Sequence, residues 1–228
     1  MKRHLKSLAA PNTWKIKRKE NDFITRPNPG HDKNQSISLI LLLKELNVAN
    51  TQKEAKYVLT QKNVMVNGKV RNDIKYPVSV FDIITIVPEK KSYTLIIDEK
   101  GKLVLRNVAD ASKKLTKLTG KITLPGKKMQ YNFIDGTCML AEKSGTKESM
   151  TVGDSVILKI PDLKIEKVLP LKSGAKVYSI SGSQKGKLAT LKSFDKKLAV
   201  LELGTEEHKT NKDYVFVVGD FFDKVIKE

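Results

Sequence analysis

The sequence has little of the chemistry that catalytic and metal sites use. It holds one cysteine among 228 residues, so neither a disulfide within the chain nor a zinc site built on several cysteines can form. Two of its three histidines, His4 and His31, lie in a basic N-terminal segment and His208 lies in a charged stretch, so none is predicted to be in a core. Cys138 lies in a strand-like segment and is interpreted as a small buried hydrophobic residue rather than a nucleophile.

Long apolar runs and phosphate-binding glycine patterns are absent as well. The longest apolar run, residues 39–43, is far shorter than the roughly 20 residues of a membrane-spanning helix, so no membrane partner is expected. Residues 120–128, GKITLPGKK, lack the G-x-x-x-x-G-K-[ST] spacing of a nucleotide-binding loop. Asp135 and Asp154 flank turns and are predicted to cap or end strands. The sequence therefore predicts no enzyme, no cofactor, no metal site and no small-molecule substrate.

Positive charge is what the sequence has in excess. The chain has 43 Lys and Arg against 25 Asp and Glu, a formal net charge of +18. The first 36 residues contain nine basic and three acidic side chains, which is about a third of that net charge. Such an excess attracts polyanions, so nucleic acid is the first candidate partner and an acidic membrane surface the second. The lack of disulfides fits a cytoplasmic location.

Residues 1–35 are predicted to form a basic N-terminal arm. They have few apolar side chains without a period, so the arm cannot offset its own ordering entropy. It is expected either to stay solvated or to order on phosphates, and Trp14 is expected to stack on a base or to anchor the arm to the rest of the chain. The candidate RNA contacts of the arm are Lys2, Arg3, His4, Lys6, Trp14, Lys15, Lys17 and Arg18.

Residues 36–98 are predicted to form a small α/β module of two helices and a hairpin. Leucines at helical spacing over residues 39–46 predict the first helix, with Ser36 as its cap. The segment from Thr51 to Glu54 has the pattern of a capping box and predicts the start of the second helix. On this second helix the apolar face contains Ala55, Val58 and Leu59, and the opposite face contains Lys53, Lys56 and Thr60.

The rest of this module is predicted to be a hairpin and a buried strand. Asn67-Gly68 between strand-like residues is a strong hairpin signal, and residues 82–87 have the pattern of a buried strand. Because two short helices cannot cover both faces of a sheet, one side is expected to stay open and to present mainly Lys, Arg and Asn. The candidate RNA contacts of the module are Lys53, Lys56, Lys69, Arg71 and Lys75.

Residues 99–168 are predicted to form a central β domain. Short strand-like runs, beginning with KLVLRNV at residues 102–108, are separated by turn residues and favour a small antiparallel sheet or barrel. This stretch also has the densest lysines of the central chain, and we expect them either to form a solvated face or to meet RNA. These lysines are Lys113, Lys114, Lys117, Lys121, Lys127 and Lys128.

Residues 169–222 are predicted to form a small β-barrel, followed by a tail at residues 223–228 that is a helical turn or a frayed end. In KVYSISGSQKGKLATL, residues 176–191, a strand, a turn with Lys185 and Lys187, and a second strand follow one another. This segment resembles the KOW motif of ribosomal proteins and elongation factors, a part of an SH3-like barrel. Its glycines permit close backbone approach, so the turn is a candidate RNA contact. The strands LAVLEL and DYVFVVG would complete the barrel.

The order of these motifs resembles a known family. The helices, the hairpin VNGKVRNDIKYP and the strand DIITI resemble a small RNA-binding fold first seen in a small-subunit ribosomal protein. With HLKSLAAPNTW before them and SGSQKGKLA and YVFVVGD after, they resemble the S4e family of small-subunit ribosomal proteins. The resemblance implies an α+β, multi-module protein that binds small-subunit rRNA beside neighbouring ribosomal proteins, with no catalytic role. The short chain favours an archaeal source.

The sequence leaves two alternative functions open. An RNA-modifying enzyme could use the same helix–hairpin module for docking, although the chain has no Arg-Leu-Asp segment of the pseudouridine-synthase type. A translation or transcription factor with a KOW motif could use the C-terminal segment to bind protein. Base conversion would identify the enzyme, and loss from ribosomes at moderate salt would identify the factor.

Overall fold

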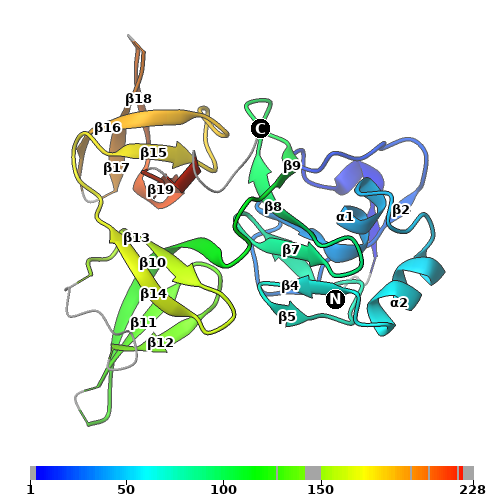
Figure 1. Ribbon diagram of the computed structural model, residues 1–228. Helices are drawn as coiled ribbons and strands as arrows, with labels where there is room; N and C mark the ends of the chain where they lie inside the picture. Colours follow the sequence, from blue (N-terminus) through cyan, green and yellow to red (C-terminus); the bar gives the residue numbers. More distant parts are fainter. Residues whose placement is uncertain are drawn as a thin grey trace. The chain divides into compact units, whose positions relative to one another are not determined.

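The computed structural model describes residues 4–126, 128–141, 150–195, 197–204, 206–219 and 221–222. They form two compact units, one of residues up to 97 with 101–111, and one of residues 98–100 with those from 112 onward (Figure 1). In these ranges two α-helices accompany nineteen strands in five sheets, so the chain is mostly β. No helix in the described ranges is both long and apolar enough to span a membrane.

The first unit is built on one five-stranded antiparallel sheet and two helices. The strand order is β5-β4-β7-β8-β9, and two further strand pairs, β1-β2 and β3-β6, lie outside this sheet. The helices are α1 (Leu39–Glu45) and α2 (Gln52–Thr60). The strands are β1 (Leu5–Lys6), β2 (Phe23–Ile24), β3 (Ser36–Ser38), β4 (Val64–Val66), β5 (Lys69–Val70), β6 (Pro77–Ser79), β7 (Ile83–Ile86), β8 (Lys91–Ile97) and β9 (Leu103–Asn107).

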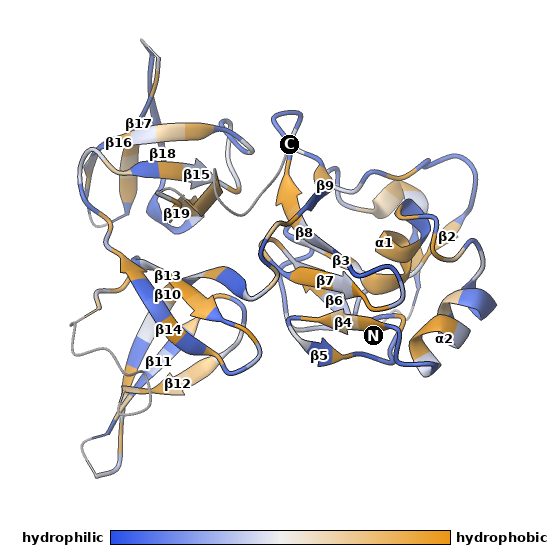
Figure 2. Ribbon diagram, viewed as in Figure 1, coloured by the Kyte–Doolittle hydropathy of each residue, from blue (hydrophilic) through white to orange (hydrophobic). Residues whose placement is uncertain are grey.

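Helix α2 begins where the local sequence predicts its cap, and helix α1 does not. The hydroxyl of Thr51 accepts a hydrogen bond from the Glu54 N–H at 3.2 Å, and the Glu54 carboxylate accepts from the Thr51 N–H, so the predicted capping box of α2 is confirmed. The predicted cap of α1 is wrong, because Ser36 lies in β3 opposite Ser79 and the helix begins after Ser38. The buried side of α1 is strongly hydrophobic (Figure 2).

The Asn-Gly hairpin is confirmed, and the structure gives Asn67 a second role. Asn67 and Gly68 have φ of 52° and 71°, and Val66 is opposite Lys69 across this two-residue turn. The Asn67 side-chain amide also donates to the Asp82 carboxylate at 2.9 Å, and its oxygen accepts from the Ile83 N–H at 3.0 Å. The turn is therefore fastened to the start of β7, which is buried as predicted.

The outer face of this sheet differs from the cationic surface that the sequence predicted. Met65 is opposite Thr85, and Thr85 is opposite Ser92, so these three side chains share one face. They are half-buried and uncharged. The expectation of a face of Lys, Arg and Asn is wrong here, because the candidate RNA-contacting cations of the module lie on the short edge strand β5, on α2 and in loops.

The strand in KLVLRNV belongs to a different sheet from the central one in which it was expected. It forms β9, which pairs with β8 in the sheet of the first unit, with Leu105 opposite Leu95. The central antiparallel sheet therefore starts only at Lys113. The register of β9 is decided by apolar partners on β8, which a count of short strands along the sequence does not reveal.

Trp14 anchors the N-terminal arm, which is ordered throughout its described residues. Its indole is 1% exposed and its Nε1 donates to the Ser36 carbonyl at 2.9 Å and to the Lys33 carbonyl at 3.2 Å. The neighbouring Thr13 carbonyl accepts from the Leu103 N–H at 2.7 Å. Of the two roles predicted for Trp14, the structure shows the anchor, because a ring buried to this extent cannot stack on a base. The alternative of a solvated arm is wrong for the described residues, because these contacts hold them on the first unit.

The second unit contains two five-stranded antiparallel sheets, with orders β12-β11-β10-β13-β14 and β18-β17-β16-β15-β19. Leu118, Phe133 and Val156 contribute to a buried core on the first of these. Its strands are β10 (Lys113–Leu124), β11 (Lys128–Phe133), β12 (Cys138–Leu140), β13 (Ser155–Lys159) and β14 (Lys164–Leu169). The strands of the other sheet are β15 (Lys176–Ser179), β16 (Leu188–Phe194), β17 (Leu198–Leu203), β18 (Glu206–Asn211) and β19 (Val215–Val217).

Two of the dense central lysines are buried and structural, rather than solvated or facing RNA. Lys114 is 3% exposed, and its ammonium pairs with the Asp135 carboxylate at 2.7 Å. Burial alone raises the pKa of Asp135, but the charge and hydrogen bond of Lys114, with hydrogen bonds from Thr137, hold that pKa below its ordinary value. This stabilisation is present above the ordinary pKa of aspartic acid and is lost as the pH falls through the lowered value.

Lys117 is the second buried lysine, and it joins the two sheets of the second unit. Its ammonium donates to the carbonyls of Lys212, Asp213 and Val215 at 2.7, 3.2 and 2.9 Å. Burial lowers the pKa of Lys117 to about 8, with the nearby Asp213 opposing and Lys212 assisting the shift. Between pH 8 and the ordinary value of 10.5 the folded chain loses this proton first, so this group makes folding more favourable as the pH rises.

We expect the loss of the Trp14 anchor to destabilise the first unit strongly. Replacing Trp14 with alanine should lower the free energy of unfolding by about 3–5 kcal/mol, because a large buried side chain and its hydrogen bonds are lost. Urea titrations followed by circular dichroism measure this, since the chain then has no tryptophan. Phe23→Ala, at an aromatic side chain of the same arm that is 58% exposed, is the control and should change stability far less. Equal losses of unfolding free energy in Trp14→Ala and Phe23→Ala would contradict the anchoring role of Trp14.

The buried pair should be far more important for stability than an exposed pair on the same strand. Asp135→Ala leaves the ammonium of Lys114 buried without its carboxylate and should cost about 3–5 kcal/mol of unfolding free energy. Glu166→Ala removes the partner of Lys113, whose side chain is 35% exposed, and should cost about 0–1 kcal/mol. Both are measured by urea denaturation at neutral pH. A small effect of Asp135→Ala would show that Lys114 is solvated.

Candidate nucleic-acid interface

Some of the predicted cations of the arm stand exposed without an ion-pair partner among the described residues, and others pair with a glutamate. His4 and Lys6 are exposed beside the short β1-β2 pair. Lys15 and Lys17 are also exposed, but Lys15 pairs with Glu45 at 3.2 Å and Lys17 with Glu20 at 2.7 Å. Both pairs are at the surface and can exchange for phosphate at small cost. Lys2 and Arg3 lie outside the described residues.

Arg18 has a different role from the one predicted. Its guanidinium donates to the Leu8 carbonyl at 3.2 Å, to the Pro11 carbonyl at 2.9 Å and to the Asn12 side chain at 3.0 Å. Three protein acceptors occupy most of its donors, so Arg18 closes the arm on itself. It therefore shapes the surface on which the free cations of the arm stand.

The loop after the hairpin brings the arm and the module together. Arg71 stacks over the ring of Tyr76 at 4.4 Å, and its Nε is buried with no hydrogen-bond acceptor among the described residues. Asn28 of the arm donates from its backbone to the Lys75 carbonyl at 2.8 Å, and from its side chain to Asp73 at 2.6 Å. The Asp73 carboxylate also accepts from the Lys75 N–H. This places exposed Lys75 and half-buried Arg71 on an ordered loop that follows exposed Lys69 in the chain.

Helix α2 presents a polar face that sequence reasoning described only in part. Ala55 and Leu59 are buried, while Lys53 and Lys56 are exposed as predicted. Tyr57 was missed, although its side chain is 68% exposed. The sequence did contain a signal for this residue. Tyr57 follows Lys53 by four residues, a spacing that places its aromatic ring on the cationic face of the helix, where a base can stack.

In the second unit the glycine-rich turn has the predicted local form. β15 and β16 pair antiparallel with Val177 opposite Ala189, and the turn between them holds Gly182 and Gly186 at φ of 91° and 81°. The Gly186 N–H donates to the Ser179 carbonyl at 2.7 Å, which fixes the turn. Lys187 is exposed and Lys185 is half-buried, so Lys187 is the more accessible of the two predicted contacts.

The residues considered for catalysis do not come together. Cys138 is exposed on the edge strand β12, so its interpretation as a buried residue is wrong. His208 lies in β18, which the sequence reading had missed as a strand, and its Nε2 is 3.2 Å from the Glu206 carboxylate. Within the described ranges no three His, Cys, Asp or Glu side chains gather where they could hold a metal ion.

Comparison with known proteins decides the family. Three family models match consecutive parts of the chain, the RS4NT domain at residues 1–33, the S4 domain at 32–95 and the ribosomal family S4e at 89–165. The small ribosomal subunit protein eS4 of Archaeoglobus fulgidus is 36% identical, over 95% of this chain and 93% of that protein. The chain belongs to the S4e family of ribosomal proteins.

Other members of the S4e family agree over the same length. The protein eS4 of Methanococcus aeolicus is 35% identical over 96% of this chain and 95% of its own, and that of Nanoarchaeum equitans is 32% identical over 98% of each. The crystal structure of the 30S ribosomal protein S4e from Thermoplasma acidophilum is 29% identical, with a TM-score of 0.68 over 81% of this chain and 95% of that one. These relatives are archaeal, as the chain length predicted.

Substitutions at the hairpin should separate binding from folding. Replacing both Lys69 and Arg71 with alanine should weaken binding to structured RNA, because at least one phosphate contact and a stacked guanidinium are lost. The stability of the chain should change little, since Lys69 is exposed and the half-buried Arg71 loses only its stack on Tyr76, and surface charges contribute weakly to folding. Arg71→Lys keeps the charge but loses the forked guanidinium and its stack on Tyr76. Its affinity for RNA should therefore lie between that of the wild type and that of the double alanine variant. Filter binding and urea titration give the two readouts, and a sharp loss of stability would make these residues structural.

Proposed function

We propose that this chain is a non-catalytic constituent of the small ribosomal subunit that binds small-subunit rRNA through separate cationic surfaces. The observation that carries this function is the likeness, over nearly the full chain, to proteins named small ribosomal subunit protein eS4. It acts in the cytoplasm as part of the ribosome, with rRNA and neighbouring ribosomal proteins as its partners. Neither a modifying enzyme nor a dissociable factor is favoured by any feature of the described residues.

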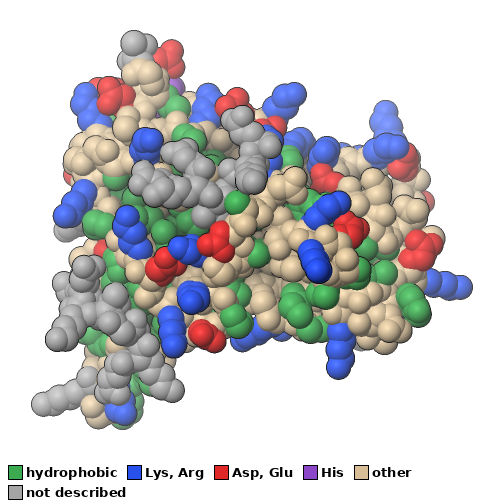
Figure 3. Space-filling view, in the orientation of Figure 1, with side chains coloured by type: hydrophobic (Ala, Val, Ile, Leu, Met, Phe, Trp, Pro, Cys, Tyr) green, Lys and Arg blue, Asp and Glu red, His purple; other side chains and the backbone are tan. Residues whose placement is uncertain are grey.

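The distribution of charge supports RNA as the ligand. On the face drawn in Figure 3 the Lys and Arg side chains are scattered and several stand beside acidic ones, rather than forming a single patch. Three sets of exposed cations are instead held on ordered elements, at the arm (Lys6), at the hairpin and its loop (Lys69, Lys75) and on α2 (Lys53, Lys56). Separated contacts of this kind suit an RNA backbone that passes over a protein, where phosphate contacts fix position.

The predicted modules take finer roles within this function. The two helices with the Asn67-Gly68 hairpin act as the S4-type RNA-binding module, supported by the S4-domain match over residues 32–95. The sheet β18-β17-β16-β15-β19, with its glycine-rich turn, acts as a KOW-type barrel whose turn residue Lys187 contacts phosphate. The divisions at residues 35, 168 and 222 stay predictions, whereas strand β9, which follows residue 98, pairs with β8 of the first unit. Exposed apolar residues of the central sheet, such as Ile122 and Met129, are suited to neighbouring proteins.

Salt dependence tests whether phosphate contacts dominate. With about 6–10 contacts to a duplex region, binding of the whole chain to a structured small-subunit rRNA fragment should weaken on the order of 10³–10⁵-fold between 50 and 200 mM salt. The measurement is a series of filter-binding titrations across that range. A flat response would contradict the proposal. Co-sedimentation with salt-washed small subunits is the companion test, because a dissociable factor leaves them at moderate salt.

A further inference from the structure

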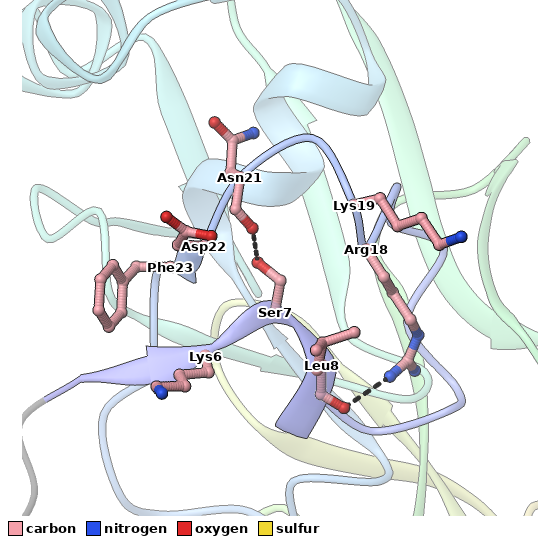
Figure 4. Close-up of a pocket in the computed structure, with 8 residues that line it drawn as sticks. All are labelled: Lys6, Ser7, Leu8, Arg18, Lys19, Asn21, Asp22 and Phe23. Atoms are coloured by element: carbon pink, nitrogen blue, oxygen red, sulfur yellow. Dashed lines mark hydrogen bonds between the residues drawn. The ribbon is translucent and has the colours of Figure 1, made fainter.

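A pocket in the N-terminal arm combines an exposed aromatic ring with free cations. It has a volume of about 440 Å³, within the range of small-ligand sites. Phe23 and Lys6 lie on one side of it, Arg18 and Lys19 on the other, with Ser7 and Leu8 between them (Figure 4). Asn21 and Asp22 complete its lining.

The aromatic wall of the pocket is open to a ligand. Lys6 of β1 is directly opposite Phe23 of β2, so the ammonium and the ring project from the same face of this strand pair. Phe23 is 58% exposed, and the ring of His4 meets it edge-on with centroids 5.7 Å apart. Phe23 is thus held by one edge contact and presents much of its surface to solvent, as does Leu8, which is 76% exposed.

The walls are held by hydrogen bonds that do not involve the ring. The Ser7 N–H donates to the Asp22 carbonyl at 2.9 Å, and the Ser7 hydroxyl donates to the Asn21 carbonyl. Arg18 clamps the opposite side through the Leu8 and Pro11 carbonyls. The pocket is therefore formed before any ligand arrives, which limits the entropy cost of binding.

The charges of the pocket point to a nucleotide rather than a lone anion. Lys6 and Lys19 make no hydrogen bond or ion pair with any described residue, so both ammonium groups are available to phosphates. The Asp22 carboxylate also lines the pocket and repels an anion placed beside it, whereas it can accept a hydrogen bond from the N–H groups of a base. Cations stand on both sides of the pocket, and an aromatic ring and a carboxylate lie on the side of Lys6, so the pocket offers contacts to the phosphates and to the base of a nucleotide.

We propose that this pocket binds a single unstacked nucleotide of RNA, with its base on the face of Phe23 and the flanking phosphates at Lys6 and Lys19. The inference rests on the proposed RNA-binding function and adds a site that reads single-stranded structure. An A-form duplex keeps its bases stacked and cannot place one on Phe23, so the pocket recognises a loop, bulge or strand end. An acidic peptide would use the cations but would gain nothing from the planar ring.

The test compares two RNA probes with the whole chain, an unstructured 12-nucleotide RNA and a 12-base-pair RNA duplex. Phe23→Ala should weaken binding of the single strand about 5- to 100-fold, as expected for one lost base stack, and should leave duplex binding unchanged. Phe23→Tyr should bind as the wild type does, because it keeps an aromatic face. Phe23→Leu is the matched control for apolar bulk, and it should bind as weakly as Phe23→Ala.

The salt dependence of binding and the fluorescence of Trp14 distinguish loss of the base stack from loss of a phosphate contact and from undocking of the arm. The slope of log affinity against log salt should be unchanged in the Phe23 variants and should fall by about 0.7 in Lys6→Ala, the loss of one single-strand phosphate contact. Emission of the buried Trp14 checks that the arm stays docked in each variant. Wild-type affinity in Phe23→Leu, or in Phe23→Ala, overturns the nucleotide site while RNA binding itself stands. A wild-type chain that binds neither probe overturns the proposed function instead.

Discussion

The contacts of the Trp14 indole hold the N-terminal arm in place, and the candidate RNA surface of the first unit depends on them. The ring is almost fully buried, and its N–H donates to the carbonyls of Lys33, before β3, and of Ser36, the first residue of β3. Without this anchor, the cations of the arm would be spread over a flexible chain and would lose entropy with every phosphate they bind. With it, Lys6, Phe23 and the loop at Asn28 are presented by a folded unit. A strongly basic segment thus becomes a shaped surface.

Positive charge serves two opposite purposes in this protein. Lys114 and Lys117 are buried, where one is neutralised by Asp135 and the other is held by three backbone carbonyls. Both hold the second unit together, and neither can reach a polyanion. Lys6, Lys53, Lys69 and Lys75 are exposed and stand on short strands, a helix or a fastened loop. The net charge of +18 therefore describes the affinity of the chain for polyanions, but it does not locate the contacts.

The exposed aromatic residues add what cations alone cannot supply. Phosphate contacts are indifferent to sequence and to pairing, so a surface made only of lysines would bind any RNA of suitable shape. Phe23 in the arm and Tyr57 on α2 each place a ring beside lysines. A ring of this kind favours unpaired bases, and it offers an S4e protein a way to prefer loops and bulges of folded RNA.

The order of motifs along the sequence indicated the family, and local patterns determined two elements, the capping box at Thr51 and Glu54 and the turn at Asn67 and Gly68. These two elements depend on side chains only a few residues apart, so the chain fixes them before it folds. The tertiary structure alone decided that Trp14 is an anchor, that Arg18 is a clamp, that Cys138 is exposed and that strand β9 joins β8. It also decided which lysines are buried, because the partners of Lys114 and Lys117 lie 21 and up to 98 residues further along the chain. Burial of a charge depends on such distant partners, and no local pattern records them.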